Sequence, residues 1–281
     1  MFFFVPYICQ MGFRKKLKRA LARHPLLFYI RFALICRNLK AGEALPEFGE
    51  LNKKEDVPPK FLEISREMKL DPSDDSLERA LEISRFIRRN VQGGPGIGLS
   101  SQKTLEKMFN QKAGICSDYA QIFNVFCLAN DIRVREWGCV ETFYKPVYGH
   151  SFSEVYSEKL DKWVMLDVGK NLYFTRQDGT EPLSVVELFQ YLRDGNPLKY
   201  VHFSDYICSD MFKIHLTYSA MMAPFIVENY DNRLYDEYLD RYDSRYPSFV
   251  INALMILREI NYRFAFPLDD YRKMLMGEKR A

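Results

Sequence analysis

Cys116 has the residue type and the sequence surroundings of a catalytic nucleophile. It follows a glycine turn at Gly114 and precedes an apolar run with helical spacing, so it should lie at the start of a helix over residues 116–129. The unpaired amides and the dipole of a helix N-terminus favour an anion, and a thiolate is such an anion. Cys116 is therefore predicted to lie where a thiol becomes reactive instead of merely buried.

His150 and Asp167 lie on a predicted hairpin that could supply a base and its orienting carboxylate. The segments HSFSEVYS and KWVMLDV alternate as strands do and are joined by a tight turn at residues 159–160. That pivot places Asp167 near Phe152, so the Cα atoms of His150 and Asp167 should lie within roughly 8 Å. Together with the thiol they would form a triad if the strand face carrying His150 and Phe152 points toward the start of the Cys116 helix.

These blocks, in this order, resemble the transglutaminase-like superfamily, a branch of the papain-like thiol enzymes. The resemblance rests on GICSDYAQIFNVFCLANDIRVREW, GHSFSEVY and KWVMLDV, and it covers roughly residues 75–175. It implies an α+β fold with a papain-like core, in which a nucleophile helix packs on a small antiparallel sheet. It also implies that Cys116 is the nucleophile, His150 the general base and Asp167 the orienting residue.

Some residues beside the predicted site depart from the pattern of many relatives. Phe152 stands where many have tryptophan, and Val168 and Gly169 follow the aspartate where many have Pro-Thr. Neither departure removes a catalytic group, but both leave the substrate preference open. Asp118 would oppose ionisation of a nearby thiol, and we expect it to point outward as an acid of the first helical turn.

An oxyanion hole would combine the backbone N–H of Cys116 with a side-chain donor upstream. Gln111 and Gln102 are the glutamines within reach, and the sequence does not choose between them. Phe152 and Trp163 are candidate aromatics of the core or the cleft wall. The remaining cysteines that we considered are predicted to be small buried hydrophobes: Cys36, Cys127, Cys139 and Cys208.

The chemistry of such a triad is acyl transfer through a thioester. The thiolate would attack an amide carbonyl, and the histidine would protonate the departing amine and then activate an acceptor. Water as the acceptor makes a cysteine peptidase or amidase, and an amine makes a transamidase; hydrolysis is favoured because water needs no second binding site. The competing hypothesis is a non-catalytic transglutaminase-like module that binds a protein. Such a module is expected to have lost a triad residue, and all three are present.

The composition argues against several other classes of function. A net charge of +3 on 281 residues does not indicate a nucleic-acid partner. The six cysteines show no CxxC spacing, and no secretory signal is evident, so we predict a cytoplasmic protein with reduced thiols. The stretch QGGPGIGLSS lacks the order of a phosphate-binding or dinucleotide-binding loop and is interpreted as a flexible connection. No metal or organic cofactor is implied, and the expected substrate is a peptide or another amide.

The N-terminus is rich in basic residues and is predicted to be helical over residues 13–40. Nine Lys or Arg residues and no acid lie between residues 14 and 40. This helix could lie on an anionic membrane surface, or it could dock on the core with a solvated basic face, which is the favoured interpretation. Met11 is an alternative start of the chain.

Three regions follow from these patterns. Residues 1–57 form a basic helical segment, residues 58–181 the transglutaminase-like catalytic core, and residues 182–281 a mainly helical extension packed on that core.

Overall fold

The computed structural model describes residue 30 and residues 32–141, 149–179, 181–205, 211–242, 245–246 and 248–276. The predicted basic helix therefore lies largely outside the described residues, as do Met11 and Cys208. Where the two overlap, residues 32–35 are helical as predicted, whereas Cys36–Asn38 form a strand. In the described ranges no helix is long and apolar enough to cross a membrane.

In the described residues, a run of helices precedes a run of strands, and helices and strands are mixed in the C-terminal region. The helices are α3 (Pro59–Met68), α4 (Ser76–Asn90), α5 (Ser101–Gln111), α6 (Cys116–Ala129), α7 (Val185–Arg193), α8 (Met211–Thr217), α9 (Asn232–Tyr242), α10 (Ser248–Leu257) and α11 (Tyr271–Met276), with 3-10 turns at Phe48–Glu50 and Lys54–Asp56. The strands are β1 (Cys36–Asn38), β2 (Val134–Val140), β3 (His150–Ser157), β4 (Lys162–Leu166), β5 (Leu172–Thr175), β6 (Lys199–His202), β7 (Ala223–Glu228) and β8 (Arg263–Phe266).

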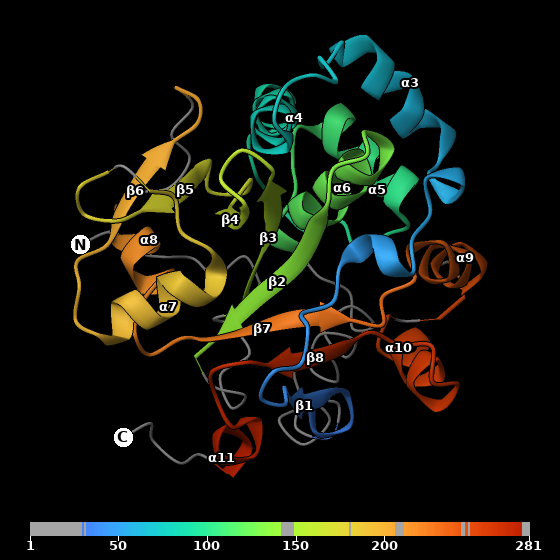
Figure 1. Cartoon of the computed structure of the whole chain (residues 1–281). Coiled ribbons are helices and arrows are strands. Elements are labelled where there is room, and N and C mark those ends of the chain that lie inside the picture. Colours follow the sequence, from blue (N-terminus) through green and yellow to red (C-terminus); the bar gives the residue numbers. More distant parts are fainter. Residues whose placement is uncertain are drawn as a thin grey trace, which may run out of the picture.

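A sheet built from distant parts of the chain crosses the molecule (Figure 1). Among the described residues its six strands have the order β1-β8-β7-β2-β3-β4, and β5 and β6 form a separate hairpin. The β1–β8 pair is parallel and the other neighbours are antiparallel, so the sheet is mixed. The predicted α+β class is confirmed, and the sheet is larger than the small antiparallel one expected.

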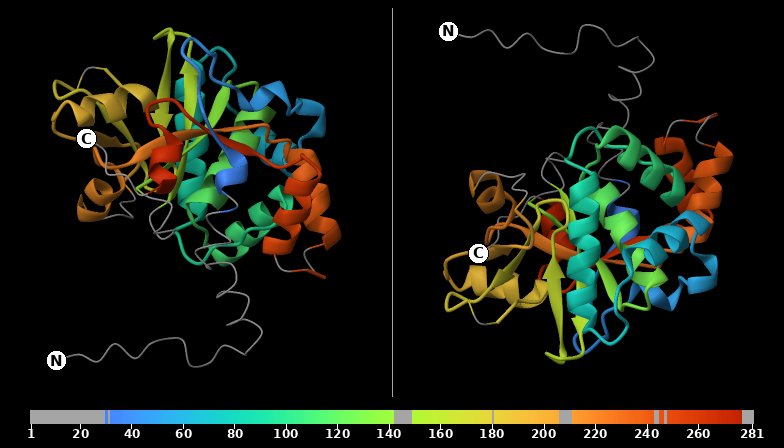
Figure 2. Two further views of the ribbon diagram at one scale, coloured as in Figure 1. Left: turned by 90° about the horizontal axis from the view of Figure 1, so that it is seen from below. Right: turned by 90° about the horizontal axis from the view of Figure 1, so that it is seen from above.

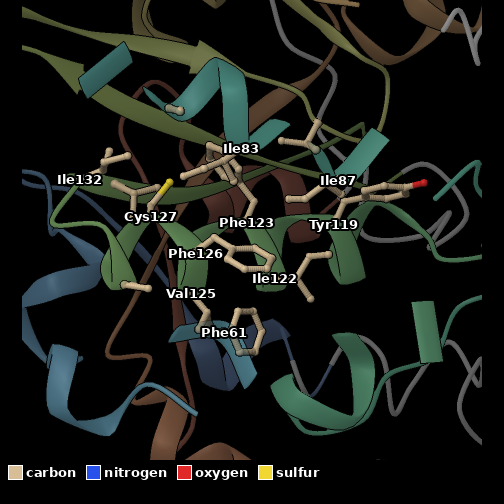
Figure 3. Packing of buried hydrophobic residues seen from close by; sticks show 14 of the residues in the cluster. Phe61, Ile83, Ile87, Tyr119, Ile122, Phe123, Val125, Phe126, Cys127 and Ile132 are labelled. Atoms are coloured by element: carbon tan, nitrogen blue, oxygen red, sulfur yellow. The ribbon is translucent and has the colours of Figure 1, made fainter. Parts of the chain in front are cut away.

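Each face of the sheet is covered by a different layer. On one face, α6 is apolar around most of its surface, as befits a central helix, and it packs with α3, α4 and α5. Figure 3 shows this core, which includes Phe61, Ile83, Ile87, Ile122, Phe123 and Phe126. On the other face lie α7, α8 and the β5–β6 hairpin, around Trp137, Phe152, Phe174, Phe189 and Tyr218. Figure 1 shows the two layers on opposite sides of β2 and β3.

The C-terminal region is less helical than expected. Residues 182–281 supply β6, β7 and β8 besides helices, and β7 pairs directly with β2. Its helix α9 is joined to the start of α5, because Asp236 accepts hydrogen bonds from the N–H and hydroxyl of Ser101 and Asp240 accepts one from Ser100. Both views of Figure 2 show α9, among the orange to red helices, beside α5.

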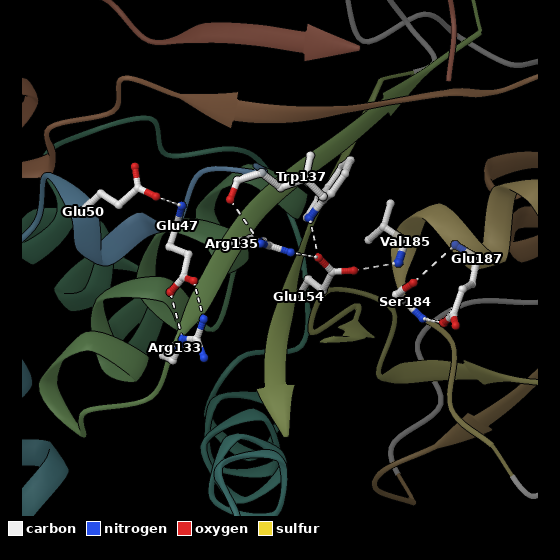
Figure 4. Close-up of polar contacts among 10 residues, drawn as sticks. Glu47, Glu50, Arg133, Arg135, Trp137, Glu154, Ser184, Val185 and Glu187 are labelled. Atoms are coloured by element: carbon white, nitrogen blue, oxygen red, sulfur yellow. Dashed lines mark hydrogen bonds and ion pairs between the residues drawn. The ribbon is translucent and has the colours of Figure 1, made fainter. Parts of the chain in front are cut away.

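Glu154 links β3 to the C-terminal layer (Figure 4). Its carboxylate is buried and accepts hydrogen bonds from Trp137 Nε1 at 3.0 Å and from the Val185 N–H at 2.8 Å, at the first residue of α7. Arg135 forms an ion pair with it at 3.6 Å. These contacts give Glu154 a structural role in packing β3 against α7.

Candidate active site

Cys116 is the first residue of α6, as predicted, and its thiol lies between two donors. The Ser151 N–H and the His150 side chain both hydrogen-bond to it. The thiol is partly buried, whereas Cys36, Cys127 and Cys139 are buried as predicted. Burial raises the pKa of the Cys127 and Cys139 thiols, so among these four only Cys116 is placed for reactivity.

His150 is held from its other side by a carboxylate. Its Nε2 lies 2.7 Å from Asp167 Oδ2, which leaves Nδ1 for the thiol. Asp167 is fully buried, and its carboxylate also accepts the Tyr218 hydroxyl at 2.7 Å and the Lys170 N–H at 2.9 Å. Cys116, His150, Asp167 and Tyr218 thus form one continuous hydrogen-bonded chain.

The pKa values of Cys116, His150 and Asp167 are shifted in directions that favour a negative thiolate and a positive imidazolium. Burial opposes ionisation of Cys116, but His150 and the Ser151 N–H outweigh it and lower the pKa of the thiol. Burial also opposes charge on His150, yet Asp167 and Cys116 raise its pKa to about 9. The pKa of Asp167 is lowered in spite of burial, mainly by His150. Both shifts favour the thiolate–imidazolium pair over the neutral thiol and imidazole.

The register of the hairpin is the predicted one. Ser153 pairs with Leu166 and Ser157 with Lys162, which brings Asp167 level with Phe152. The orientation predicted for the strand face is wrong, however. Ser153 hydrogen-bonds to Asn124 of α6, so the odd-numbered residues of β3 face the nucleophile helix. Phe152 lies in the opposite layer, and His150 reaches the thiol because it stands at the very start of the strand.

Asp118 points inward, contrary to the expectation. It is buried, and its carboxylate accepts the backbone N–H of Ile115 and Ile97 at 3.0 Å and of Gly98 at 3.1 Å. The glycine-rich stretch is therefore fastened to the start of α6, and it is not the flexible connection that its composition suggested. A carboxylate can do this because three donors at a helix start and a loop would otherwise lack acceptors.

We predict that Asp118→Ala lowers the free energy of unfolding by about 2–4 kcal/mol, because three backbone N–H groups lose a charged, buried acceptor. Asp118→Asn keeps one oxygen acceptor and should cost less. Urea denaturation of both variants, with the exposed Asp74→Ala as control, measures the difference. A loss for Asp118→Ala no larger than for Asp74→Ala would contradict the role of Asp118.

The other predicted site residues lie at varying distances from the thiol. Phe152 is buried next to His150, with ring centroids 6.0 Å apart. Trp163 instead stacks with Arg135, whose guanidinium lies 3.7 Å from its ring centroid, toward the far end of β3. Gln102 hydrogen-bonds to Glu106 along α5, and Gln111 is exposed at the end of that helix. None of these contacts brings Trp163 or either glutamine to Cys116.

Gly169 marks a close approach between the loop after β4 and the nucleophile helix. A Cβ at this position would lie 3.3 Å from Asp167 Oδ1 and 3.7 Å from the Cα of Cys116. A glycine here lets the loop pass close to the thiol and turn so that the Lys170 N–H reaches the carboxylate. The departure from the Pro-Thr pattern thus has a steric role in this chain.

Sequence reasoning missed Tyr218, which completes the hydrogen-bonded chain from a residue just after α8. Its sequence surroundings carry no motif, and only the packing of the C-terminal layer brings it to Asp167. In the ranges that the structure describes, no three His, Cys, Asp or Glu side chains are grouped to hold a metal ion.

Comparisons with known proteins find a family match in the central part of the chain. Residues 63–168 match the family model of the transglutaminase-like superfamily. No curated protein matches the chain significantly. A solved structure of a provisionally assigned cysteine protease from Cytophaga hutchinsonii is 18% identical, with a TM-score of 0.33, over 52% of this chain and 49% of the other. The chain thus spans about half the length of that protein, a likeness too slight to indicate function. By sequence, the segment 63–168 is therefore similar to the transglutaminase-like superfamily.

Proposed function

We propose that this protein is a thiol-dependent enzyme that transfers acyl groups from amide bonds. The observation that carries the proposal is the hydrogen-bonded chain from Cys116 through His150 to Asp167, with the pKa of the thiol lowered and that of the imidazole raised to about 9. Similarity of the central segment to the transglutaminase-like superfamily supports the same assignment.

In the proposed reaction, the Cys116 thiolate attacks the amide carbonyl and forms a C–S bond. The resulting oxyanion is stabilised by the Cys116 N–H at the start of α6. His150 donates its Nδ1 proton to the amide nitrogen, the C–N bond breaks, and the amine leaves a thioester behind. Neutral His150 then removes a proton from the acceptor, which attacks the thioester and releases the thiolate.

Asp167 keeps the imidazole ring in position throughout and stabilises its charged form. Water as the acceptor gives a carboxylic acid, and a primary amine gives a new amide. We favour hydrolysis, because water needs no binding site of its own. Mass spectrometry of the products, with and without an added primary amine, separates the two outcomes.

The decisive experiment is alkylation of Cys116 by iodoacetamide across the pH range. At about pH 6.5 an ordinary thiol of pKa about 8.5 is roughly 1% ionised. Because His150 stabilises the thiolate, Cys116 should be labelled about tenfold or more faster than free cysteine at this pH, the lower nucleophilicity of a low-pKa thiol notwithstanding. His150→Ala should remove most of this advantage and move the profile toward higher pH. Peptide mass spectrometry measures each site.

Two controls accompany this experiment. Buried Cys127 should stay unlabelled in the native protein. His202 is another hydrogen-bonded histidine, with its Nδ1 2.9 Å from the carbonyl oxygen of Asn171. His202→Ala should leave the pH profile of Cys116 labelling unchanged. If Cys116 reacts as an ordinary thiol and ignores His150→Ala, the proposal fails, and the alternative of a non-catalytic protein-binding module takes its place.

A further inference from the structure

A cavity of about 250 Å³ lies directly beside the candidate nucleophile. Ser117 and Ser151 line it, and the N–H of Ser151 is the group that donates to the Cys116 thiol. The cavity is therefore bounded by two residues that adjoin the triad, Ser117 next to Cys116 and Ser151 next to His150. A substrate group attached near the scissile amide would enter it.

Aromatic side chains from the C-terminal region form much of the cavity wall. Tyr230 lies 5.4 Å from Tyr235 and 6.2 Å from Tyr262 between ring centroids, and Tyr235 and Tyr262 are 6.0 Å apart. All three line the cavity, as does Phe225. Gly138 makes room for Phe225, because a Cβ on this glycine would come within 2.5 Å of the Phe225 ring.

Asp118 and Glu136 both line this cavity, and because the Asp118 carboxylate is engaged by three backbone N–H groups, Glu136 supplies the carboxylate for a ligand. Glu136 lies on the sheet face that α6 covers, and it accepts a hydrogen bond from Asn124 Nδ2 at 3.1 Å. The Oδ1 atom of Asn124 is engaged by the Ser153 hydroxyl at 2.7 Å, so the amide is held in this orientation. In the described part of the chain, no Lys or Arg forms an ion pair with Glu136. Burial raises the pKa of Glu136 to about 7.

A half-buried carboxylate without a cation is only partly compensated by water, and a ring of aromatic faces attracts a cation through its quadrupole. The two features are complementary, since a bound cation would compensate the carboxylate while its alkyl stem packs against the rings. An acidic or strongly polar neutral group would gain neither interaction. The cavity is thus suited to an organic cation on an apolar stem.

We propose that the cavity lined by Glu136, Tyr230, Tyr235 and Tyr262 binds the ammonium or guanidinium group of the substrate, beside the Cys116 thiol. Its part in catalysis rests on the function proposed above, whereas its affinity for cations does not. The structure thereby assigns a role in selectivity to the C-terminal region, which supplies the three tyrosines.

Binding should be measured on Cys116→Ala protein, so that the result is independent of catalysis. The probes are n-butylammonium, n-butylguanidinium and neutral 1-butanol, followed by ligand-observed NMR at about pH 8.5, above the Glu136 pKa of about 7. We expect the two cations to bind at least tenfold more tightly than butanol. Glu136→Gln, which can still accept from Asn124, should abolish that preference, while the exposed Glu55→Gln should not.

A second pair of variants tests the aromatic wall. Tyr235→Ala should weaken cation binding several-fold, and Tyr238→Ala, on the same helix but outside the cavity lining, should not. Circular dichroism verifies that each variant is folded. Equal binding of butanol and butylammonium, or an unchanged preference in Glu136→Gln, overturns the proposal.

With the intact thiol, two substrate experiments determine whether the bound cation belongs to the acyl donor or to the acceptor. Faster cleavage of lysine peptides than of norleucine isosteres, lost in Glu136→Gln, places it on the acyl donor. Preferred incorporation of butylamine over its neutral methoxyamine analogue, lost in the same variant, places it on the acceptor. If the enzyme turns over but shows no preference for the cationic substrate in either experiment, the cation site is disproved and the catalytic proposal is not. Absence of turnover together with selective binding to Cys116→Ala would count against the catalytic proposal instead.

Discussion

Asp167→Ala should be among the most damaging single substitutions in the chain, lowering the free energy of unfolding by about 3–5 kcal/mol. It removes a fully buried carboxylate and leaves the His150 imidazolium, the Tyr218 hydroxyl and the Lys170 N–H without their acceptor. Asp167→Asn keeps an oxygen and the volume, so it should cost less. In both variants the pKa of His150 falls and the pKa of Cys116 rises, so iodoacetamide labelling near pH 6.5 should slow about tenfold or more.

The effect of Asp167→Ala on stability should depend on pH in a definite direction. The pKa of Asp167 is lowered, so its contribution is present above about 3.9 and is lost as the pH falls below that. The pKa of His150 is raised to about 9, so its contribution is complete below about 6.5 and is lost as the pH rises through 9.

The difference between wild type and Asp167→Ala should therefore be largest between about pH 4 and 6.5 and narrower at pH 10. Urea denaturation at several pH values measures it. Asp56→Ala removes an exposed partner of Arg233 and should change stability by less than about 0.5 kcal/mol at every pH. A pH-independent difference for Asp167→Ala would show that the pair with His150 is not ionic.

Glu154→Ala should destabilise the protein by a similar amount, about 3–5 kcal/mol, without touching the thiol. The substitution leaves the Arg135 guanidinium, the Trp137 N–H and the Val185 N–H buried without their shared acceptor (Figure 4). Glu154→Gln fills the same space but offers one acceptor oxygen instead of two, and should cost about 1–3 kcal/mol.

Urea denaturation gives the size of this effect, and hydrogen exchange gives its location. The Val185 N–H at the start of α7 should exchange faster in both Glu154 variants than in wild type. Glu181→Ala is the matched control, because Glu181 is half exposed and its ion pairs with Lys162 and Arg176 lie at the surface. Loss of stability in Glu154→Ala equal to that in Glu181→Ala would be the contrary result.

Local sequence patterns were sufficient for the parts of the site that are close together in the chain. The start of α6 follows from the glycine turn and the apolar run after it, and the β3–β4 register follows from the tight turn between two alternating segments. These features depend on short-range geometry, in which turn position and side-chain period leave few alternatives.

Long-range packing decided what those patterns could not predict. Asp118 resembles a surface acid in the sequence because two of its hydrogen-bond donors, the N–H groups of Ile97 and Gly98, belong to a loop that sequence alone does not place. Tyr218 and Tyr235 reach the site region only through the layers built by residues after 182. The short strand β8 was concealed within an apolar run that is otherwise helical.

The strand order of the sheet also has a consequence for when the fold can be completed. β2 pairs with β7, which is synthesised long after the Cys116 helix. β1, the first described strand, pairs with β8 near the end of the chain. Strand pairings this far apart in sequence form slowly, because the entropy cost of closing a long loop comes before the favourable contacts between the strands. A growing polypeptide on the ribosome would carry the cysteine before it carries Tyr218 or the strands beside β2. The complete sheet and the hydrogen bond from Tyr218 to Asp167 can therefore form only after most of the chain has been synthesised.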